Sequence, residues 1–251
     1  MDFQEQVMGL TELTIDASST IPRRAELSQF LKDGVMEVTR RCIESYPAEI
    51  DLFARKSSII GSNSSLNLNG ARIISVMREA AADGSSDGST AWRECRKIPL
   101  SLQSRVADPE SLYFASKYNP VYTVEENGLI NVYPVPDGGT ANGFRVHYVN
   151  NEPVNDSGSA LAYNHSTIKY FPADKVYLVV LYAAIKSIEG KLSSYTIVDE
   201  DIELVQGLNA SLAVLAAEFA SAFPPPMQQQ GRDRTRTNRT RREPRRGGRG
   251  G

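Results

Sequence analysis

Two neighbouring segments of this chain repeat the same apolar spacing, and this repeat constrains the fold more than any other feature. In each segment apolar residues stand at offsets 0, 3, 7, 10 and 14, a period of 3.5 residues that is typical of packed helices. The first seam consists of Leu178, Leu181, Ile185, Ile188 and Leu192, and the second of Val205, Leu208, Leu212, Leu215 and Phe219. A short connection separates them, so we expect an antiparallel helical hairpin.

Two more segments near the start of the chain have helical signals. Residues 3–10 allow one or two short helical turns. A longer amphipathic helix is predicted to begin near Thr20, a good N-cap, with Pro22 in its first turn and Pro47 at its end. Its apolar face consists of Leu27, Leu31, Val35, Val38 and Cys42. The helix at 174–192 is apolar on nearly all sides, which predicts a central position against a third helix or a neighbouring subunit.

The middle of the chain has strand patterns. We expect strands in 71–79 and 91–100 and a part-helical stretch around 109–115. The clearest local signal is Asn127-Gly128 between two β-prone runs, because Asn-Gly supplies the positive φ of a tight hairpin turn. A third strand is predicted in 143–150, where alternation places Phe144, Val146 and Tyr148 on one face.

These signals predict an α+β fold. It combines an N-terminal amphipathic helix and a C-terminal antiparallel hairpin, together a helical bundle, with a β-rich insertion and a disordered tail. The predicted segments are 1–56 (helices), 57–165 (β-rich insertion), 166–223 (helical hairpin) and 224–251 (tail rich in Pro, Gln, Arg and Gly).

The tail differs sharply from the rest of the chain in charge. Residues 231–251 hold nine arginines and two acids, a charge of +7, whereas the whole chain is −2 and the first 230 residues are therefore −9. Without apolar side chains the tail has nothing to bury, so we expect it to be disordered alone and to order on a partner. Its candidate partner-binding residues are Arg232, Arg234, Arg236, Arg239, Arg241, Arg242, Arg245, Arg246 and Arg249. Arginine pairs with carboxylates and phosphates alike, so an acidic protein surface and DNA both remain open.

No catalytic residue, cofactor site or metal site is predicted. His147 and His165 lie outside any recognisable catalytic motif, and "DGSSDGST" lacks the acids and closing glutamate of a calcium loop. Cys42 and Cys95 have no metal-ligand spacing, and we expect buried free thiols. No signal peptide or membrane span is predicted, so we expect a soluble protein.

Several phrases resemble a virion structural protein of tailed bacteriophages, particularly marine phages. They are "SLYFASKYNPVYTVEENGLINVYPVP", "FRVHYVNNEPVN" and "IKYFPADKVYLVVLYAAIKSIEGKL", and the likeness covers most of residues 1–192. The resemblance is to head–tail connector (adaptor) proteins. It implies a helical bundle with a β-rich extension, a ring that is usually twelvefold beneath the portal, and no active site. The arginine-rich ending departs from a typical adaptor.

Two main functions follow as expectations. The first is a structural subunit of the phage neck, located at the head–tail interface of the virion and in the host cytoplasm before assembly. Its partners would be itself, the portal protein, and the tail or a second neck protein, with possible contact to packaged DNA and none to a membrane. The alternative is a nucleic-acid-binding virion protein that uses the arginine-rich arm on phosphate backbones. A third, an envelope hydrolase carried in the virion, lacks paired acids in a recognisable setting.

The predicted hairpin supplies a candidate assembly contact. Tyr118, Tyr122 and Tyr133 surround it, and tyrosine is common where two protein surfaces meet, although these rings could equally cover the domain's own sheet. Glu125 and Glu126 lie at its tip. If the tip is a contact, replacing both glutamates by lysine should spare folding and impair assembly.

Overall fold

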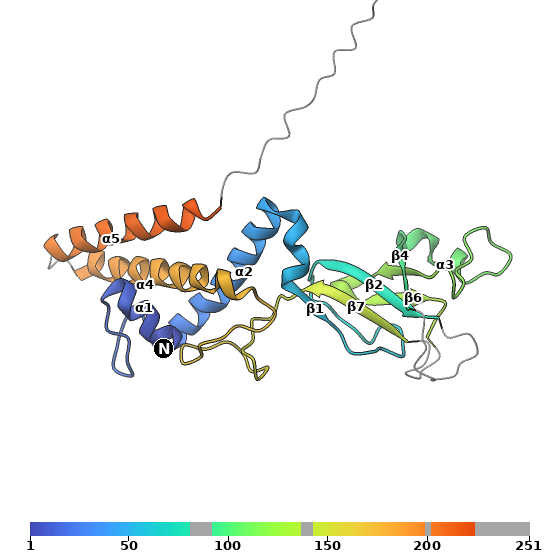
Figure 1. Cartoon of the computed structure of the whole chain (residues 1–251), viewed down its shortest axis with the longest axis horizontal. Coiled ribbons are helices and arrows are strands. Elements are labelled where there is room, and N and C mark those ends of the chain that lie inside the picture. The colour runs from blue at the N-terminus through green and yellow to red at the C-terminus, as the bar shows by residue number, and fades with distance from the viewer. Residues whose placement is uncertain (81–91, 137–142, 199–201, 224–251) are drawn as a thin grey trace, which may run out of the picture.

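The computed structural model describes residues 1–80, 92–136, 143–198 and 202–223. They form a mixed α+β protein with an elongated shape, helical at one end and β-rich at the other (Figure 1). We call these ends the helical half and the β-rich half. The predicted turn-rich segment 80–90 lies almost entirely outside the described residues, as does the arginine-rich tail.

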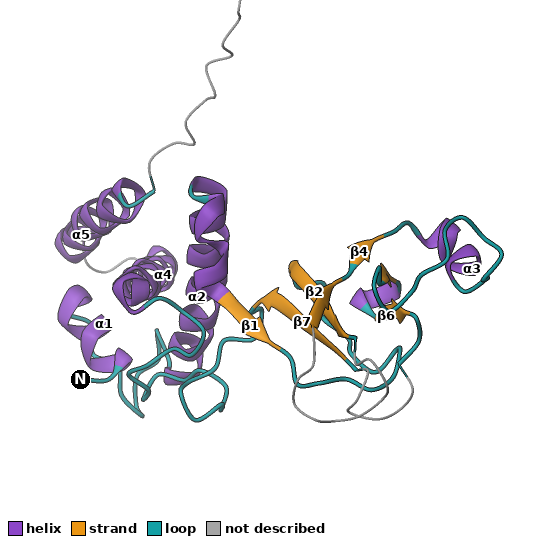
Figure 2. Ribbon diagram, turned by 45° about the vertical axis from the view of Figure 1, so that its right-hand side comes forward, coloured by secondary structure: helices purple, strands orange, loops and turns teal. Residues whose placement is uncertain are grey.

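The helical half is built from four helices that share one core. They are α1 (Phe3–Thr11), α2 (Arg24–Ser45), α4 (Val176–Val198) and α5 (Ile202–Ser221). α4 contacts each of the other three, and Figure 2 looks almost along its axis with the others around it. Short 3-10 turns precede or follow these helices at Pro47–Phe53 and Ala173–Lys175.

The predicted start of α2 is wrong by several residues. The helix begins at Arg24 rather than near Thr20, and Thr20 does not cap it. The side chain of Glu26 instead accepts a hydrogen bond of 2.8 Å from the backbone N–H of Arg23. An acid at the third helical position satisfies the N–H of the residue before the helix in this way, whereas a hydroxyl cap would accept from an N–H of the first turn, and α2 has no such side-chain cap.

The apolar surface of α4 is covered within the chain itself. Val179, Val180, Ala183 and Ala184, which lie outside the predicted seam, are all buried together with Leu181. Of the two alternatives, a third helix or a neighbouring subunit, the structure therefore supports the first, because α1 and α2 pack on the sides that α5 leaves free. No neighbouring subunit is needed to cover α4.

The β-rich half contains two sheets. The first has the order β1-β7-β2-β3 and is antiparallel throughout, whereas the second has the order β4-β5-β6 with β4 parallel to β5. The strands are β1 (Ala54–Lys56), β2 (Ile73–Glu79), β3 (Trp92–Glu94), β4 (Arg96–Lys97), β5 (Val121–Val124), β6 (Ile130–Tyr133) and β7 (Phe144–Val149).

The hairpin and strand predictions agree with the observed pairing. β5 and β6 are antiparallel and joined through a 3-10 turn at Glu126–Gly128, where Gly128 has a φ of 85°. Phe144, Val146 and Tyr148 are all buried on one face of β7. Period-two alternation therefore identified the core face of this strand correctly.

The part-helical stretch predicted around 109–115 is wrong. The helical turns come earlier, at Leu100–Leu102 and in α3 (Gln103–Val106), and the chain from Asp108 to Ala115 forms turns. Pro109 cannot donate the backbone hydrogen bond of a helix interior, and the side chain of Asp108 accepts the N–H of Glu110 at 3.0 Å instead.

The β-rich half is inserted between α2 and α4. The chain leaves the helical half along β1 and returns along β7, and these two strands pair with Ala54 opposite Val149. The two connections between the halves thus lie side by side, and a groove lined by α2, residues 70–72 and the end of β7 lies at this junction.

Candidate assembly surfaces

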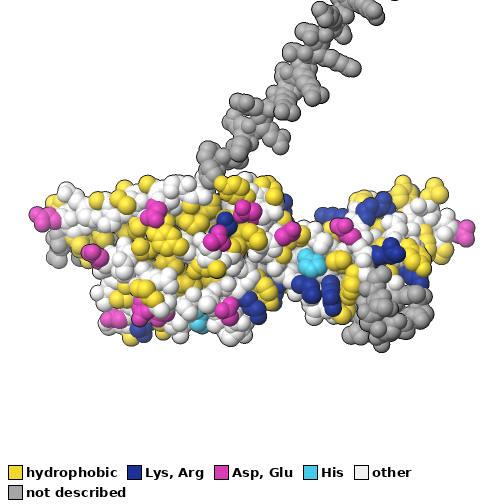
Figure 3. Space-filling model, in the orientation of Figure 1, with side chains coloured by type: hydrophobic (Ala, Val, Ile, Leu, Met, Phe, Trp, Pro, Cys, Tyr) yellow, Lys and Arg dark blue, Asp and Glu magenta, His cyan; other side chains and the backbone are white. Residues whose placement is uncertain are grey.

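One face of α5 is largely apolar, and none of the described residues covers it. Leu208, Leu215 and Phe219 are buried against the core, but only 17% of the most apolar 18-residue window of this helix is buried. Ile202 is 77% exposed and Val214 is 66% exposed. Figure 3 shows hydrophobic side chains reaching the surface over the helical half, the part formed by α5 included.

The uncovered side of α5 carries mainly small side chains between Glu203 and Glu218. Its central line is Gly207, Ala210, Val214, Ala217 and Ser221, spaced three and four residues apart and all exposed; we call it the open face of α5. A Cβ added at Gly207 would meet nothing within 4 Å. Glu203 and Glu218 are the only charged residues in the helix. Small side chains allow another helix to approach closely, which a charged surface would oppose.

By length and composition alone, α5 is apolar enough to cross a membrane. The longest unbroken apolar run in the sequence lies in α4, and it gives no indication that α5 is long and apolar enough to span a membrane. A signal was present in the sequence: residues 204–217 contain no charged side chain.

The second surface is a groove of about 480 Å³ at the junction of the two halves. Its apolar lining comes mainly from Met36 and Ile43 of α2 and Val149 of β7, and we call it the junction groove. Met36 is 42% exposed. The guanidinium of Arg72 stands at this groove and makes no ion pair with any described residue.

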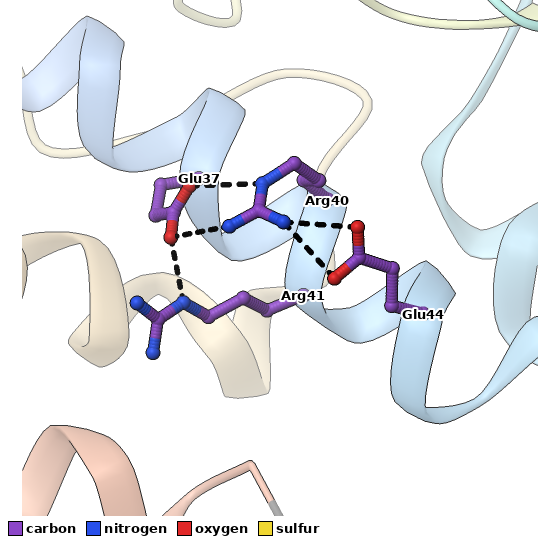
Figure 4. A network of polar contacts seen from close by, with 4 residues as sticks. All are labelled: Glu37, Arg40, Arg41 and Glu44. Atoms are coloured by element: carbon purple, nitrogen blue, oxygen red, sulfur yellow. Dashed lines mark hydrogen bonds and ion pairs between the residues drawn. The ribbon is translucent and has the colours of Figure 1, made fainter. Parts of the chain in front are cut away.

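A charged network borders the junction groove on α2 (Figure 4). Arg40 pairs with Glu37 at 2.8 Å and with Glu44 at 2.9 Å, and Arg41 pairs with Glu37 at 2.6 Å. The hydrogen bond from Arg40 holds the pKa of Glu37 below its usual range. Most of these groups are exposed, so the pairs add little stability.

The third surface lies at the far end of the β-rich half, in residues 107–118, which we call the distal loop. Three consecutive large side chains point outward there: Leu112 is fully exposed, Tyr113 is 46% exposed and Phe114 is 43% exposed. Tyr118 is 62% exposed and lies under the guanidinium of Arg93 at 5.2 Å. Sequence reasoning missed this surface because it expected a helix at this position.

The structure corrects the predicted contact at the hairpin. Tyr122 and Tyr133 are 8% and 9% exposed because their rings pack into two separate clusters of the β-rich half. The carboxylate of Glu125 accepts hydrogen bonds from Gln103 and Asn131, so a lysine there would disturb folding. Glu126 is exposed. Only Glu126 and Tyr118 therefore remain available to a partner.

The two histidines and the tail arginines that the sequence singled out do not form a common site among the described residues. His147 is on β7 with Nδ1 3.1 Å from the hydroxyl of Ser75, and His165 is in a loop of the helical half. Among the described residues no group of histidine, cysteine and acid side chains could hold a metal ion. The nine tail arginines, Arg232 to Arg249, lie outside the described residues.

Both cysteines are free and buried. Burial raises the pKa of the Cys95 thiol to about 12 and also raises that of Cys42. Neither thiol is therefore activated as a nucleophile near neutral pH.

The chain matches no protein-family model and no curated protein sequence.

Proposed function

We propose that the chain is a structural subunit of the neck of a tailed bacteriophage, where copies form a ring that joins the portal to the tail and continues the DNA channel. The open face of α5 is the observation that carries this proposal. A monomer seldom exposes a helix face that is free of charge over a stretch as long as residues 204–217, and such surfaces mark protein contacts. In the proposal, the four helices act as a bundle with α4 and α5 as its hairpin.

The chemistry of the open face fits permanent assembly. Its central line, from Gly207 to Ser221, is about 21 Å long, since a helix rises about 1.5 Å per residue. Each Å² of apolar surface removed from water contributes about 25 cal/mol. A neighbouring subunit that covers this strip therefore gains stability in proportion to the apolar area that it buries.

The resemblance of the amino-acid sequence to head–tail connector proteins supports the same proposal. An adaptor acts through shape and contact, and the three surfaces described above belong to both halves of the molecule. The portal and a tail or second neck protein are the proposed partners. The alternative function, binding of nucleic acid by the arginine-rich arm, is favoured by the +7 charge of residues 231–251.

The test places a charge on the open face. Val214→Glu should convert an assembled ring to monomers, because the carboxylate would have to be buried without a partner. Leu52→Glu is the matched control, since Leu52 is 55% exposed in the helical half but outside α5. Native mass spectrometry with and without purified portal protein measures both variants.

Two results would contradict the proposal. One is a wild-type protein that stays monomeric at all concentrations and ignores the portal. The other is a monomer that floats with phosphatidylcholine vesicles through α5, because this helix would then be a membrane segment.

A further inference from the structure

The distal loop presents its apolar tip on a fixed base. The backbone N–H of Ala115 donates to the carbonyl of Val106 at 3.0 Å, and both residues are buried in a small cluster below the loop. Within the loop, Ser111 donates to Asp108 and Phe114 donates to Ser111, each at 3.0 Å. A loop held in this way loses little conformational freedom when it binds, so its exposed side chains can serve as anchors.

The same chain contains a surface that could receive such an anchor. The junction groove is concave, has an apolar lining around Met36, and lies in the middle of the molecule, away from the distal loop. Its volume of about 480 Å³ falls within the usual range for binding pockets. The elongated shape of the chain keeps its own distal loop out of its own groove (Figure 1).

We propose that the distal loop of one copy inserts Leu112 and its neighbours into the junction groove of the next copy, so that subunits join head to tail. This inference rests on the proposed ring and names one of its contacts.

The distribution of charge favours a second copy as the occupant and a head-to-tail arrangement. Residues 1–53 have ten acids and five bases, and residues 151–230 have nine acids and four bases. Residues 54–150, which include both sheets, have nine acids and ten bases. Two helical halves therefore repel each other, whereas the β-rich half of one copy can approach the helical half of the next without this cost.

One local charge agrees with this arrangement. Arg72, which has no ion-pair partner among the described residues, would meet a loop that carries Asp108 and Glu110. A contact between two different surfaces of one chain is heterologous, and repeated contacts of this kind close into a ring when the rotation permits.

The test uses cysteine cross-linking between two singly substituted proteins. Met36→Cys and Leu112→Cys both replace exposed side chains, so neither should disturb folding. The native Cys42 and Cys95 are buried and give little background. When the two proteins are mixed and mildly oxidised, we expect a disulfide-linked dimer at least about tenfold more abundant than with a control, because docking raises the local thiol concentration. Val135→Cys replaces Leu112→Cys in the control, since Val135 is also exposed in the β-rich half.

Each outcome decides the inference. A cross-link in the mixture that exceeds the control and each variant alone supports it. Efficient cross-linking of Leu112→Cys with itself would mean that loops meet loops, which overturns it. If rings form and the mixture gives no more product than the control, the inference fails while the proposed function stands. If the wild-type protein forms no ring, both fail together.

Discussion

The guanidinium carbon of Arg41 lies 5.0 Å from the ring centroid of Phe219, and 5.6 Å from that of Phe223. This residue of α2 therefore covers two aromatic rings at the end of α5, while its Nε donates to Glu37 at 2.6 Å. The two rings also contact each other edge to face at a centroid distance of 5.2 Å. The last turn of α5 is fixed to α2 by this stack.

Replacing Arg41 with alanine should loosen the end of α5. We expect a loss of about 1 kcal/mol in the free energy of unfolding, a typical value for a partly buried cation–aromatic contact. Hydrogen exchange should rise in the last turns of α5. Arg40→Ala is the control, because Arg40 makes only exposed ion pairs and contacts neither ring. Equal effects of the two substitutions would show that the stack contributes nothing.

Gly34 should tolerate no larger side chain, because α2 and α4 approach closely there. A Cβ at Gly34 would lie 3.1 Å from Tyr182 and 3.2 Å from Val179. Gly34→Val should therefore destabilise the protein by about 1–3 kcal/mol, the usual cost of overpacking. Gly9→Val is the matched substitution in α1, where an added Cβ meets nothing within 4 Å, and it should be close to neutral. Urea denaturation of both variants measures the difference.

Stability should fall in alkaline solution through Cys95. Burial raises the pKa of this thiol from 9.0 to about 12, so the folded state keeps a proton that the unfolded state releases above pH 9. The stabilising contribution is thus complete below pH 9 and is lost as the pH rises toward 12. The slope from this group is about 1.4 kcal/mol per pH unit at most.

Cys95→Ala isolates the effect of the thiol. Burial also raises the pKa of Tyr122, so the wild-type protein and the variant should share a background loss of stability at high pH. We expect the free energy of unfolding, measured by urea titration at several pH values, to fall less steeply in the variant. Parallel curves would show that Cys95 has an ordinary pKa in the folded protein.

Deletion of residues 231–251 separates the two partners considered for the arginine-rich tail. If the tail binds duplex DNA through seven phosphates, the logarithm of the binding constant should fall with the logarithm of salt concentration with a slope of about −6. Deletion should then abolish DNA binding and leave rings intact. A tail that binds an acidic protein surface predicts the reverse, weaker ring or portal association in the absence of DNA. If rings and DNA retention are both unchanged, the tail has neither role.

Patterns within short segments of the sequence predicted those helices, strands and turns whose formation depends on neighbouring residues. The spacing of Leu181, Ile185 and Ile188 identified buried positions of α4, and Asn127-Gly128 identified the turn between β5 and β6. Alternation identified the buried face of β7. These features depend on the period of a helix or strand and on the backbone freedom of glycine, both of which a short segment reveals.

The candidate surfaces could not be predicted in the same way, because burial depends on partners that are distant in sequence. The sequence predicts an apolar helix for both α4 and α5. Only the packing of α1 and α2 shows that α4 is covered and that α5 is not. Tyr122 and Tyr118 are four residues apart, yet the first is buried and the second is exposed. The junction groove combines α2 with Arg72 and β7, which no local pattern connects.

The position of α1 against α4 has a consequence for synthesis on the ribosome. α1 cannot pack against α4 until the ribosome has synthesised α4, which begins at Val176. Both sheets, in contrast, are formed by residues of one continuous stretch. The β-rich half can therefore fold while the ribosome is still translating the rest, and the helical core closes last. Until then the apolar side of α2 is exposed to solvent, where chaperones can bind it.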